Sequence, residues 1–149
     1  MGRMTHPIAR LHQACAALGT RLFTVSILDR AAGLSRRAYT SHPAEYPAQG
    51  TKPMLDDAWF DHCIRKARPF LANTPAEFEK HFFDHALITS MGLGSALNIP
   101  VADVTGTITA TVNLLAEAHH FTPEKLQAYL SLVAEARATL LTDALFTAT

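Results

Sequence analysis

The chain has 149 residues, 48% of them hydrophobic and 17% charged, and its 13 basic residues balance its 13 acidic ones. This length and composition are typical of one globular domain, so we expect a single domain over 1–149. Because nucleic-acid phosphates are neutralised by a basic surface, the zero net charge argues against a nucleic-acid-binding protein.

Neither a membrane span nor a signal peptide is indicated. No apolar run approaches the roughly 20 residues that cross a bilayer, and the N-terminus lacks an apolar signal core. The sequence therefore predicts a cytoplasmic protein without membrane contact. Cys15 and Cys63 lie far apart, each within a helical pattern. In a reducing compartment they are expected to be buried thiols rather than a disulfide, and no Cys-x-x-Cys spacing indicates a metal site.

The first helix is expected to begin near Pro7, because the fixed dihedral of proline suits the first helical position, and to end at Gly19. Its apolar stripe comprises Ile8, Leu11, His12, Cys15 and Leu18. Two strands follow, 22–28 and 34–41, joined by a hairpin loop at 29–33. In the first strand, apolar residues alternate with Thr24 and Ser26, which is typical of a half-buried strand.

Three prolines and a glycine within 41–53 predict a loop of about a dozen residues without regular structure. Loops of that length in a compact domain are usually functional or disordered, and His42, Tyr46 and Lys52 favour an ordered one. A helix is expected next. Asp56 and Asp57 stand at its N-terminus, where the helix dipole favours negative charge. Its apolar side comprises Leu55, Trp59, Phe60, Cys63, Ile64 and Ala67.

The segment 69–92 is expected to hold a short strand at 69–73 and two short helices. Thr74-Pro75-Ala76-Glu77 matches a capping box with proline at the first helical position. The second short helix runs from 84 to 91 and ends at Gly92. His81 and His85 are four residues apart, which is a spacing that can bind a metal from one helix face. A helix break is expected between them, however, and we predict no metal site.

Two alternating runs, 95–101 and 107–115, flank a turn at 103–106. Leu97, Ile99 and Val101 share one face of the first run. In the second run Ile108, Ala110, Val112 and Leu114 alternate with Thr107, Thr109, Thr111 and Asn113. This period of two predicts a β-hairpin. It also places Asn98 and Asn113 on the same face, where backbone carbonyls at a strand end are their expected partners.

The chain is expected to end in a long helix that opens at Thr122-Pro123-Glu124. Just before it, His119 and His120 are expected to cap the strand end or to lie on the surface. The helix has a broad apolar stripe comprising Leu126, Tyr129, Leu130, Val133, Leu140, Leu141 and Leu145. In chain order the elements are helix, two strands, helix, strand, two helices, two strands and helix, which predicts an α+β fold with an antiparallel sheet.

Several consecutive motifs resemble the C-terminal half of a GAF domain, and the upstream elements come in that family's order too. The motifs are Gly94-Ser95-Ala96-Leu97-Asn98-Ile99-Pro100-Val101, Gly106, Val112-Asn113-Leu114-Leu115 and His120-Phe121-Thr122-Pro123-Glu124. The resemblance implies a PAS-related antiparallel sheet with the first and last helices on one face and a segment enclosing a ligand pocket on the other. It also implies a small-molecule sensor that often forms a homodimer through its terminal helices.

A pocket for a small polar molecule needs apolar walls and a few fixed polar groups, and the middle of the chain offers both. The candidate ligand-binding residues are Ser41, His42, Tyr46, Lys52, Trp59, Asn73, Phe83, Asp84, His85, Ser95 and Asn98. Lys52 is the best single anchor for a ligand that carries a carboxylate or phosphate. Each of these residues can instead belong to the core or satisfy backbone groups of a loop.

The sequence thus predicts a stand-alone, non-catalytic GAF-like domain that binds a small metabolite and signals through a separate effector protein. It identifies no ligand or cofactor. The cyclic-nucleotide motif of the family is absent, and so is the Cys-His pair of its bilin-binding members. The free methionine sulfoxide reductases of the family rely on cysteines in ligand-side loops, whereas both cysteines here fall in expected helices. Two alternatives stay open: an enzyme with His42 or His85 as general base, and a protein-interaction module with an occluded pocket.

Overall fold

A six-stranded antiparallel sheet with the order β3-β2-β1-β6-β5-β4 forms the centre of the structure, a computed structural model that describes residues 6–142. The central hairpin pairs β5 with β6, and β1 extends the sheet from β6. The strands are β1 (Leu22–Asp29), β2 (Leu34–Thr40), β3 (Thr51–Pro53), β4 (Phe70–Ala72), β5 (Ser95–Ala102) and β6 (Ile108–Ala116).

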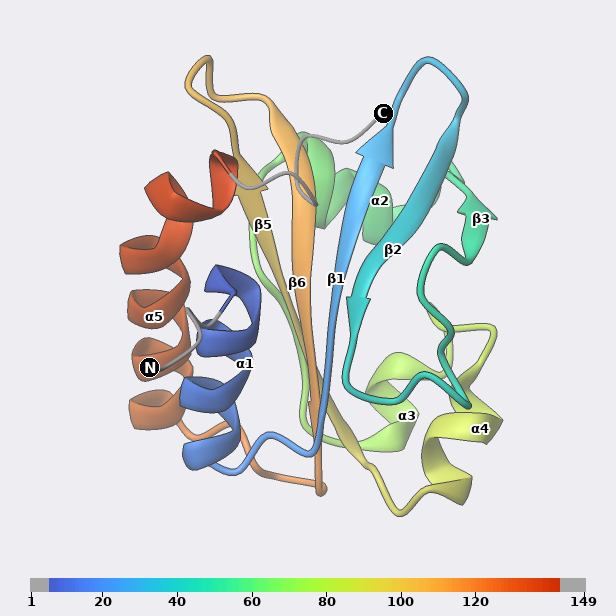
Figure 1. The fold of residues 1–149 in the computed structure, drawn as a ribbon. Helices are drawn as coiled ribbons and strands as arrows, with labels where there is room; N and C mark the ends of the chain where they lie inside the picture. The colour runs from blue at the N-terminus through green and yellow to red at the C-terminus, as the bar shows by residue number, and fades with distance from the viewer. Residues whose placement is uncertain (1–5, 143–149) are drawn as a thin grey trace.

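Two terminal helices, α1 (Pro7–Ala17) and α5 (Pro123–Leu141), cover one face of this sheet (Figure 1). The apolar positions of the alternating strands point toward them and form the main core. The buried strand residues of this core include Phe23, Val25, Ile27, Leu97, Ile99, Val101, Ala110, Val112 and Leu114. They pack against Ile8, Leu11, Cys15, Tyr129, Val133 and Leu140. Leu145, expected in the same stripe, lies outside the described residues.

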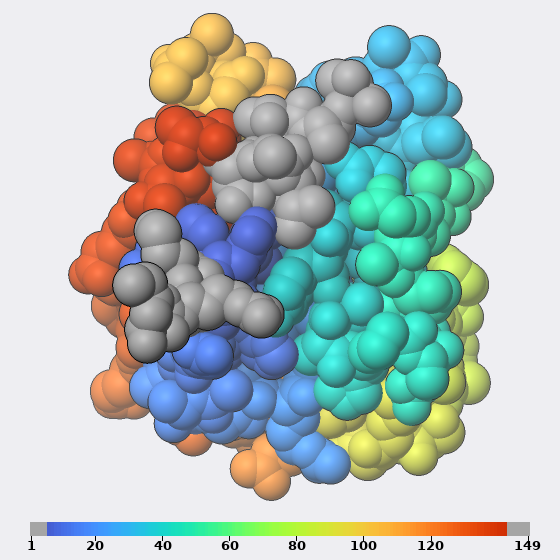
Figure 2. Space-filling model, viewed as in Figure 1, coloured from blue at the N-terminus to red at the C-terminus, as the bar shows by residue number. Residues whose placement is uncertain are grey.

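The middle segment, residues 41–91, supplies both edge strands and covers the opposite face (Figure 1). Its helical parts are α2 (Ala58–Phe60), a π-helical turn (Asp61–Arg65), α3 (Pro75–Phe78) and α4 (His85–Ser90). In the space-filling view, its teal loop and the yellow-green region of α4 adjoin at the lower right (Figure 2). The predicted α+β architecture is confirmed. Between residues 6 and 142, no helix is long and apolar enough to cross a membrane.

Two expectations for the middle segment were wrong. Residues 51–53 are not irregular but form β3, which pairs with β2. Pro53 is tolerated there because β3 is an edge strand with no further partner. The helix expected to run to Ala67 is instead a short α-helix continued by the π-helical turn, whose Lys66 N–H donates to Asp61 O at 3.0 Å. It ends before Ala67, which adopts φ 53°.

A register shift in the central hairpin corrects the expected position of Ile108. Val101 pairs with Ala110 but Ala102 pairs with Ile108, so Thr109 is an extra residue in β6. Ile108 consequently packs with Cys63 and Ile64 under the middle segment rather than with Ala110 against the terminal helices.

The capping box at 74–77 also forms only in part. The Thr74 hydroxyl donates to Glu77 Oε1 (3.1 Å), which also accepts from Asn73 N (3.2 Å), and no side chain caps α3.

His120 is buried, contrary to the expected surface position or strand cap, with only 4% of its surface exposed. Its Nε2 lies 2.7 Å from the Tyr129 hydroxyl, which also accepts a hydrogen bond from Thr20 Oγ1 at 2.9 Å. The ring fills the space beside Gly19, where φ is 112° and an added Cβ would lie 2.6 Å from His120 Cε1. Glycine at 19 is therefore required by both the backbone conformation and the close approach of this ring.

Candidate functional site

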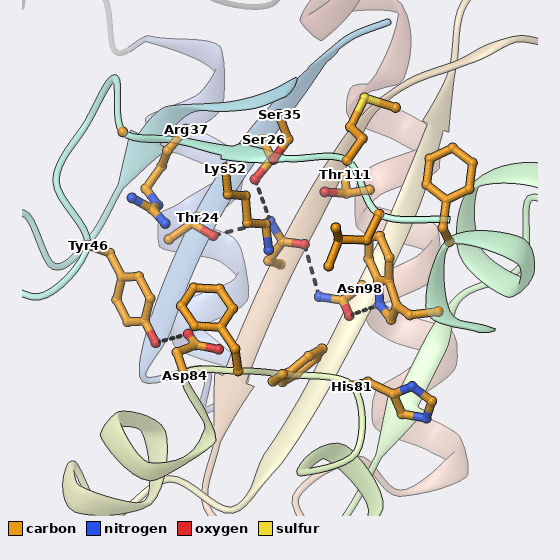
Figure 3. A pocket seen from close by; sticks show the side chains of 18 of the residues that line it. Thr24, Ser26, Ser35, Arg37, Tyr46, Lys52, His81, Asp84, Asn98 and Thr111 are labelled. Atoms are coloured by element: carbon orange, nitrogen blue, oxygen red, sulfur yellow. Dashed lines mark hydrogen bonds between the residues drawn. The ribbon is translucent and has the colours of Figure 1, made fainter. Parts of the chain in front are cut away.

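A cavity of about 300 Å³ lies between the sheet and the middle segment. Its floor is the sheet face opposite α1 and α5, and its walls are side chains of residues 46–60 and 81–88 (Figure 3). The polar floor residues are Thr24, Ser26, Ser35, Arg37, Asn98, Thr111 and Asn113. The walls include Tyr46, Lys52, Met54, Trp59, His81, Phe82, Phe83 and Asp84.

Several of these floor residues are polar although they are buried. Thr24, Asn98 and Thr111 expose only 6%, 6% and 2% of their surface. A sheet face that only packed against an apolar core would itself be apolar. Buried polar side chains such as these need hydrogen-bond partners. The alternation that suggested a half-buried first strand therefore marks two covered faces, one facing the apolar core and the other facing the cavity.

A chain of side-chain hydrogen bonds connects the wall to the floor (Figure 3). Trp59 Nε1 donates to Asn98 Oδ1 at 2.9 Å, and Asn98 Nδ2 donates to Asn113 Oδ1 at 2.9 Å. Asn113 Nδ2 then donates to Thr24 Oγ1 and Ser26 Oγ, each at 3.2 Å. The two asparagines are directly paired across β5 and β6, which confirms their predicted common face. Their expected backbone partners were wrong, because side chains satisfy both amides.

A second hydrogen bond joins two parts of the middle segment at one end of the cavity. The Tyr46 hydroxyl donates to Asp84 Oδ2 at 2.5 Å, and the Arg37 guanidinium stacks 5.0 Å above the Tyr46 ring centroid. Burial, followed by the bond to Asp84, raises the pKa of Tyr46 well above its ordinary value. The phenol therefore stays protonated, and it ties the loop after β2 to the turn before α4 at neutral pH.

Lys52 stands on the edge strand with its ammonium beside the cavity (Figure 3). The residue as a whole is exposed, but the surrounding protein displaces water from the ammonium, and this desolvation lowers the Lys52 pKa. Asp84 and Asp57 oppose the shift and Arg37 adds to it. Within residues 6–142, the Lys52 ammonium forms no ion pair or hydrogen bond.

Six of the eleven predicted ligand-binding residues line the cavity: Tyr46, Lys52, Trp59, Phe83, Asp84 and Asn98. Of these, Phe83 is 84% exposed. The cavity lining does not include Ser41, His42, Asn73, His85 or Ser95.

Three of those five bind backbone groups instead. Ser41 Oγ accepts from Phe23 N (2.8 Å), and Ser95 Oγ donates to Glu117 O (2.6 Å). Asn73 accepts from Phe121 N and donates to Phe121 O at 3.0 and 3.1 Å. His42 Nδ1 lies 2.7 Å from Ser41 Oγ, and His85 is the first residue of α4.

Six polar floor residues were not among the predicted ligand-binding residues: Thr24, Ser26, Ser35, Arg37, Thr111 and Asn113. Their signal was present in the polar positions of alternating strands. It was read as a solvent-facing side because no local pattern shows that the middle segment covers it.

Both cysteines are free and buried, as predicted, and neither lines the cavity. Cys15 belongs to the core under α1, and Cys63 packs with Ile64 and Ile108. Burial raises the pKa of each thiol to about 12, so neither is a reactive thiolate at neutral pH. In the described part of the chain, no three His, Cys, Asp or Glu side chains are grouped as a metal site would require.

No protein-family model matches the chain, and no curated protein sequence does. Solved structures, however, match about nine-tenths of it. The GAF domain/HD domain protein from Geobacter sulfurreducens has a TM-score of 0.71 and 15% identity, covering 93% of this chain and 94% of that one.

Two further structures are similar. The GAF domain of a two-component sensor histidine kinase from Bacillus halodurans has a TM-score of 0.70 and 10% identity, covering 90% of this chain and 92% of that one. A type II free methionine-R-sulfoxide reductase from Thermoplasma acidophilum has a TM-score of 0.57 and 15% identity, covering 91% of this chain and 94% of that one. At these identities the likeness establishes the fold and leaves the ligand open.

Proposed function

Because the chain has the fold of the GAF domains, we propose that it binds a small molecule in the cavity as a non-catalytic sensory or regulatory domain. The supporting observation is the buried polar floor beneath an aromatic wall. The hydroxyls of Ser35 and Thr111 have no hydrogen-bond partner within residues 6–142. Since every fully buried side-chain N or O atom in that range has one, both hydroxyls reach the cavity space.

The cavity is large enough for such a ligand. Its volume of about 300 Å³ lies at the lower end of the usual range for small-molecule sites, and it combines apolar walls with a few fixed polar groups. A side-chain-filled interior, expected for a purely structural partner module, would have no such space. The alternative with an occluded pocket is therefore less well supported than ligand binding.

A route for the signal lies in the middle segment. A ligand in the cavity would contact both the sheet and the residues of the loop and of α4 that Tyr46 and Asp84 join. If the ligand binds more tightly to one arrangement of the middle segment than to another, its binding would increase the population of the favoured arrangement. The surface of the middle segment would then present the bound state to an effector protein.

Among the histidines of residues 6–142 only His81 lines the cavity, so the general bases expected from the sequence are not the ones found there. His42 and His85, considered as general bases, do not line the cavity. Sulfoxide reduction, the activity of the Thermoplasma relative, would need a thiolate at the ligand. Neither Cys15 nor Cys63 lines the cavity, and burial holds both in the thiol form. These observations favour binding over catalysis.

We also propose that two copies associate through α1 and α5. The supporting feature is that leucines of α5 remain only partly buried within one copy: Leu126, Leu130, Leu132 and Leu141. Light scattering coupled to size exclusion tests this directly, with about 32 kDa expected because one chain is 16.2 kDa. A mass near that of one chain at tens of micromolar would contradict it.

The binding proposal is tested by filling the cavity. Ser35→Phe would project a ring from the floor, whereas Ser35→Ala leaves the space open. A metabolite panel is screened by thermal shift on the wild type and both variants. We expect at least one compound to stabilise the wild type and Ser35→Ala, and none to stabilise Ser35→Phe. Equal shifts in all three proteins, or no shift with any compound, would contradict the proposal.

A further inference from the structure

Ser35, Arg37 and Lys52 form a cluster of hydrogen-bond donors at the β2–β3 edge of the cavity. The strand register pairs Ser35 with Lys52, so their side chains project from the same face of the sheet. Arg37 is two residues along β2 and shares that face, and all three line the cavity. Figure 3 shows Lys52 between Arg37 and Ser35.

The free binding capacity of this cluster suits one negative charge. Arg37 is already held, because its Nη1 donates to Pro47 O at 2.9 Å and its plane lies over Tyr46. It therefore contributes positive potential more than new hydrogen bonds. Lys52 and Ser35 have no partners within residues 6–142, which leaves an ammonium and a hydroxyl open to the cavity. Desolvation of the ammonium lowers the Lys52 pKa, and an anionic partner would relieve that cost.

Two carboxylates near the same cluster disfavour a ligand with more negative charge. Asp84 and Asp57 both line the cavity and both act on Lys52. Only one oxygen of Asp84 is occupied by the Tyr46 hydroxyl. Both carboxylates would repel a dianion placed at Lys52 more strongly than a monoanion, whose single charge the Lys52 ammonium can balance.

The opposite side of the cavity is apolar. Trp59 is fixed over β5 by its hydrogen bond to Asn98, three strands away from β2 in the sheet. Phe60, which belongs to the same apolar cluster as Trp59, and Phe82, which contacts Phe70 of β4, also line the cavity. Such surfaces gain from contact with hydrocarbon or an aromatic ring rather than with a second polar group.

We propose that the cavity takes a small monocarboxylate with an apolar or aromatic body. Lys52 and Ser35 bind the carboxylate in the field of Arg37, and the body packs against Trp59 and its neighbours. The inference rests on the proposed small-molecule function and adds the chemical class of the ligand.

The test compares acids with their neutral amides, using phenylacetate against phenylacetamide and isovalerate against isovaleramide. Trp59 is the only tryptophan in the chain, so its fluorescence reports binding at the cavity, and calorimetry gives an independent affinity. We expect each amide to bind at least about tenfold more weakly than its acid, since a charge-assisted contact is lost. Phenyl phosphate, a dianion, should bind more weakly than phenylacetate.

Lys52→Met keeps the length of the side chain and removes the charge, and the exposed Lys80 outside the cavity offers a matched control. We expect Lys52→Met to weaken acid binding about tenfold or more and to abolish the acid–amide difference, with Lys80→Met unchanged. Ser35→Ala should weaken acids and leave amides unaffected. Unaltered far-UV circular dichroism and a cooperative melting transition show that each variant is folded.

Each contrary result has a separate meaning. Equal binding of acids and amides, an unaffected Lys52→Met, or tighter binding of phenyl phosphate would overturn the monocarboxylate assignment and leave the proposed function intact. So would a panel in which only neutral compounds bind. If no compound of any class binds, both proposals fail.

Discussion

Asn98→Leu tests the polar chain that fixes the aromatic wall to the floor of the cavity. The replacement keeps the number and the branching of the side-chain heavy atoms, so it opens no void in the sheet. It removes the acceptor of Trp59 Nε1 and the donor to Asn113 Oδ1, both at 2.9 Å. The variant therefore removes both hydrogen bonds while keeping the shape of a side chain that is 6% exposed.

The expected cost follows from these two orphaned groups. A buried polar group left without its partner costs about 1–3 kcal/mol. Trp59 and Asn113 are only partly buried and border the cavity, so the lower end applies to each, about 1 kcal/mol. We expect Asn98→Leu to lower the free energy of unfolding by about 2 kcal/mol, or the Tm by roughly 4–8 °C for a domain of this size.

Urea unfolding followed by far-UV circular dichroism measures this change without using the Trp59 signal. Trp59→Phe keeps most of the ring and deletes the N–H, which allows a double-mutant cycle with Asn98→Leu. Because both replacements break the same bond, the double variant should be about 0.5–1.5 kcal/mol more stable than the sum of the single losses predicts. A loss below about 0.5 kcal/mol for Asn98→Leu, or strict additivity in the cycle, would refute the reasoning.

Three further predictions concern the loop, the edge lysine and the fold. Tyr46→Phe deletes the hydrogen bond between the loop after β2 and the turn before α4, so amide hydrogen exchange should accelerate in both segments. The free energy of unfolding should fall by about 1 kcal/mol. Unchanged exchange in the two segments would contradict this prediction. Desolvation lowers the Lys52 pKa below its ordinary 10.5, so the unfolded chain holds this proton more tightly. At neutral pH, urea titrations should therefore show Lys52→Met to be more stable than the wild type. As the pH rises through the lowered pKa of folded Lys52 toward 10.5, the free energy of unfolding of the wild type should increase relative to that of Lys52→Met. Parallel pH profiles of the two proteins would argue against this. Gly19→Ala places a Cβ on a residue with positive φ and brings it within 2.6 Å of the buried His120 ring. We expect the free energy of unfolding to fall by about 2–4 kcal/mol. Gly33→Ala, with φ 67° and no neighbour within 4 Å, should cost about 1–2 kcal/mol, and an equal effect at both glycines in thermal melts would exclude the steric part.

The sheet was predictable wherever its two faces differ in polarity over several residues. Alternation in 95–101 and 107–115 placed Asn98 and Asn113 on the same face, and in the structure the two are direct cross-strand partners. The prediction failed at Ile108, because one extra residue in β6 turns the Ile108 side chain to the other face of the sheet. The residue types around this position do not indicate the extra residue. The prediction also failed at β3, whose three exposed residues do not alternate.

The candidate site was predictable only in part, because its contacts join residues distant in sequence. Trp59 and Asn98 are 39 residues apart, and Tyr46 and Asp84 are 38 apart. The types of these residues indicated a pocket, but the sequence alone does not reveal which of their side chains are in contact. His120 illustrates the same limit, since its ring fills the space beside Gly19, about a hundred residues earlier in the chain.

Native mass spectrometry of the purified protein, followed by denaturation of the same sample, tests the central claim most directly. We expect a defined small mass that accompanies the folded chain, leaves on unfolding and carries an ionisable acid. Ligand at about 100 times its dissociation constant adds roughly 2.7 kcal/mol, so its removal should also lower the Tm. A bare chain whose melting no compound in the panel alters would contradict the account.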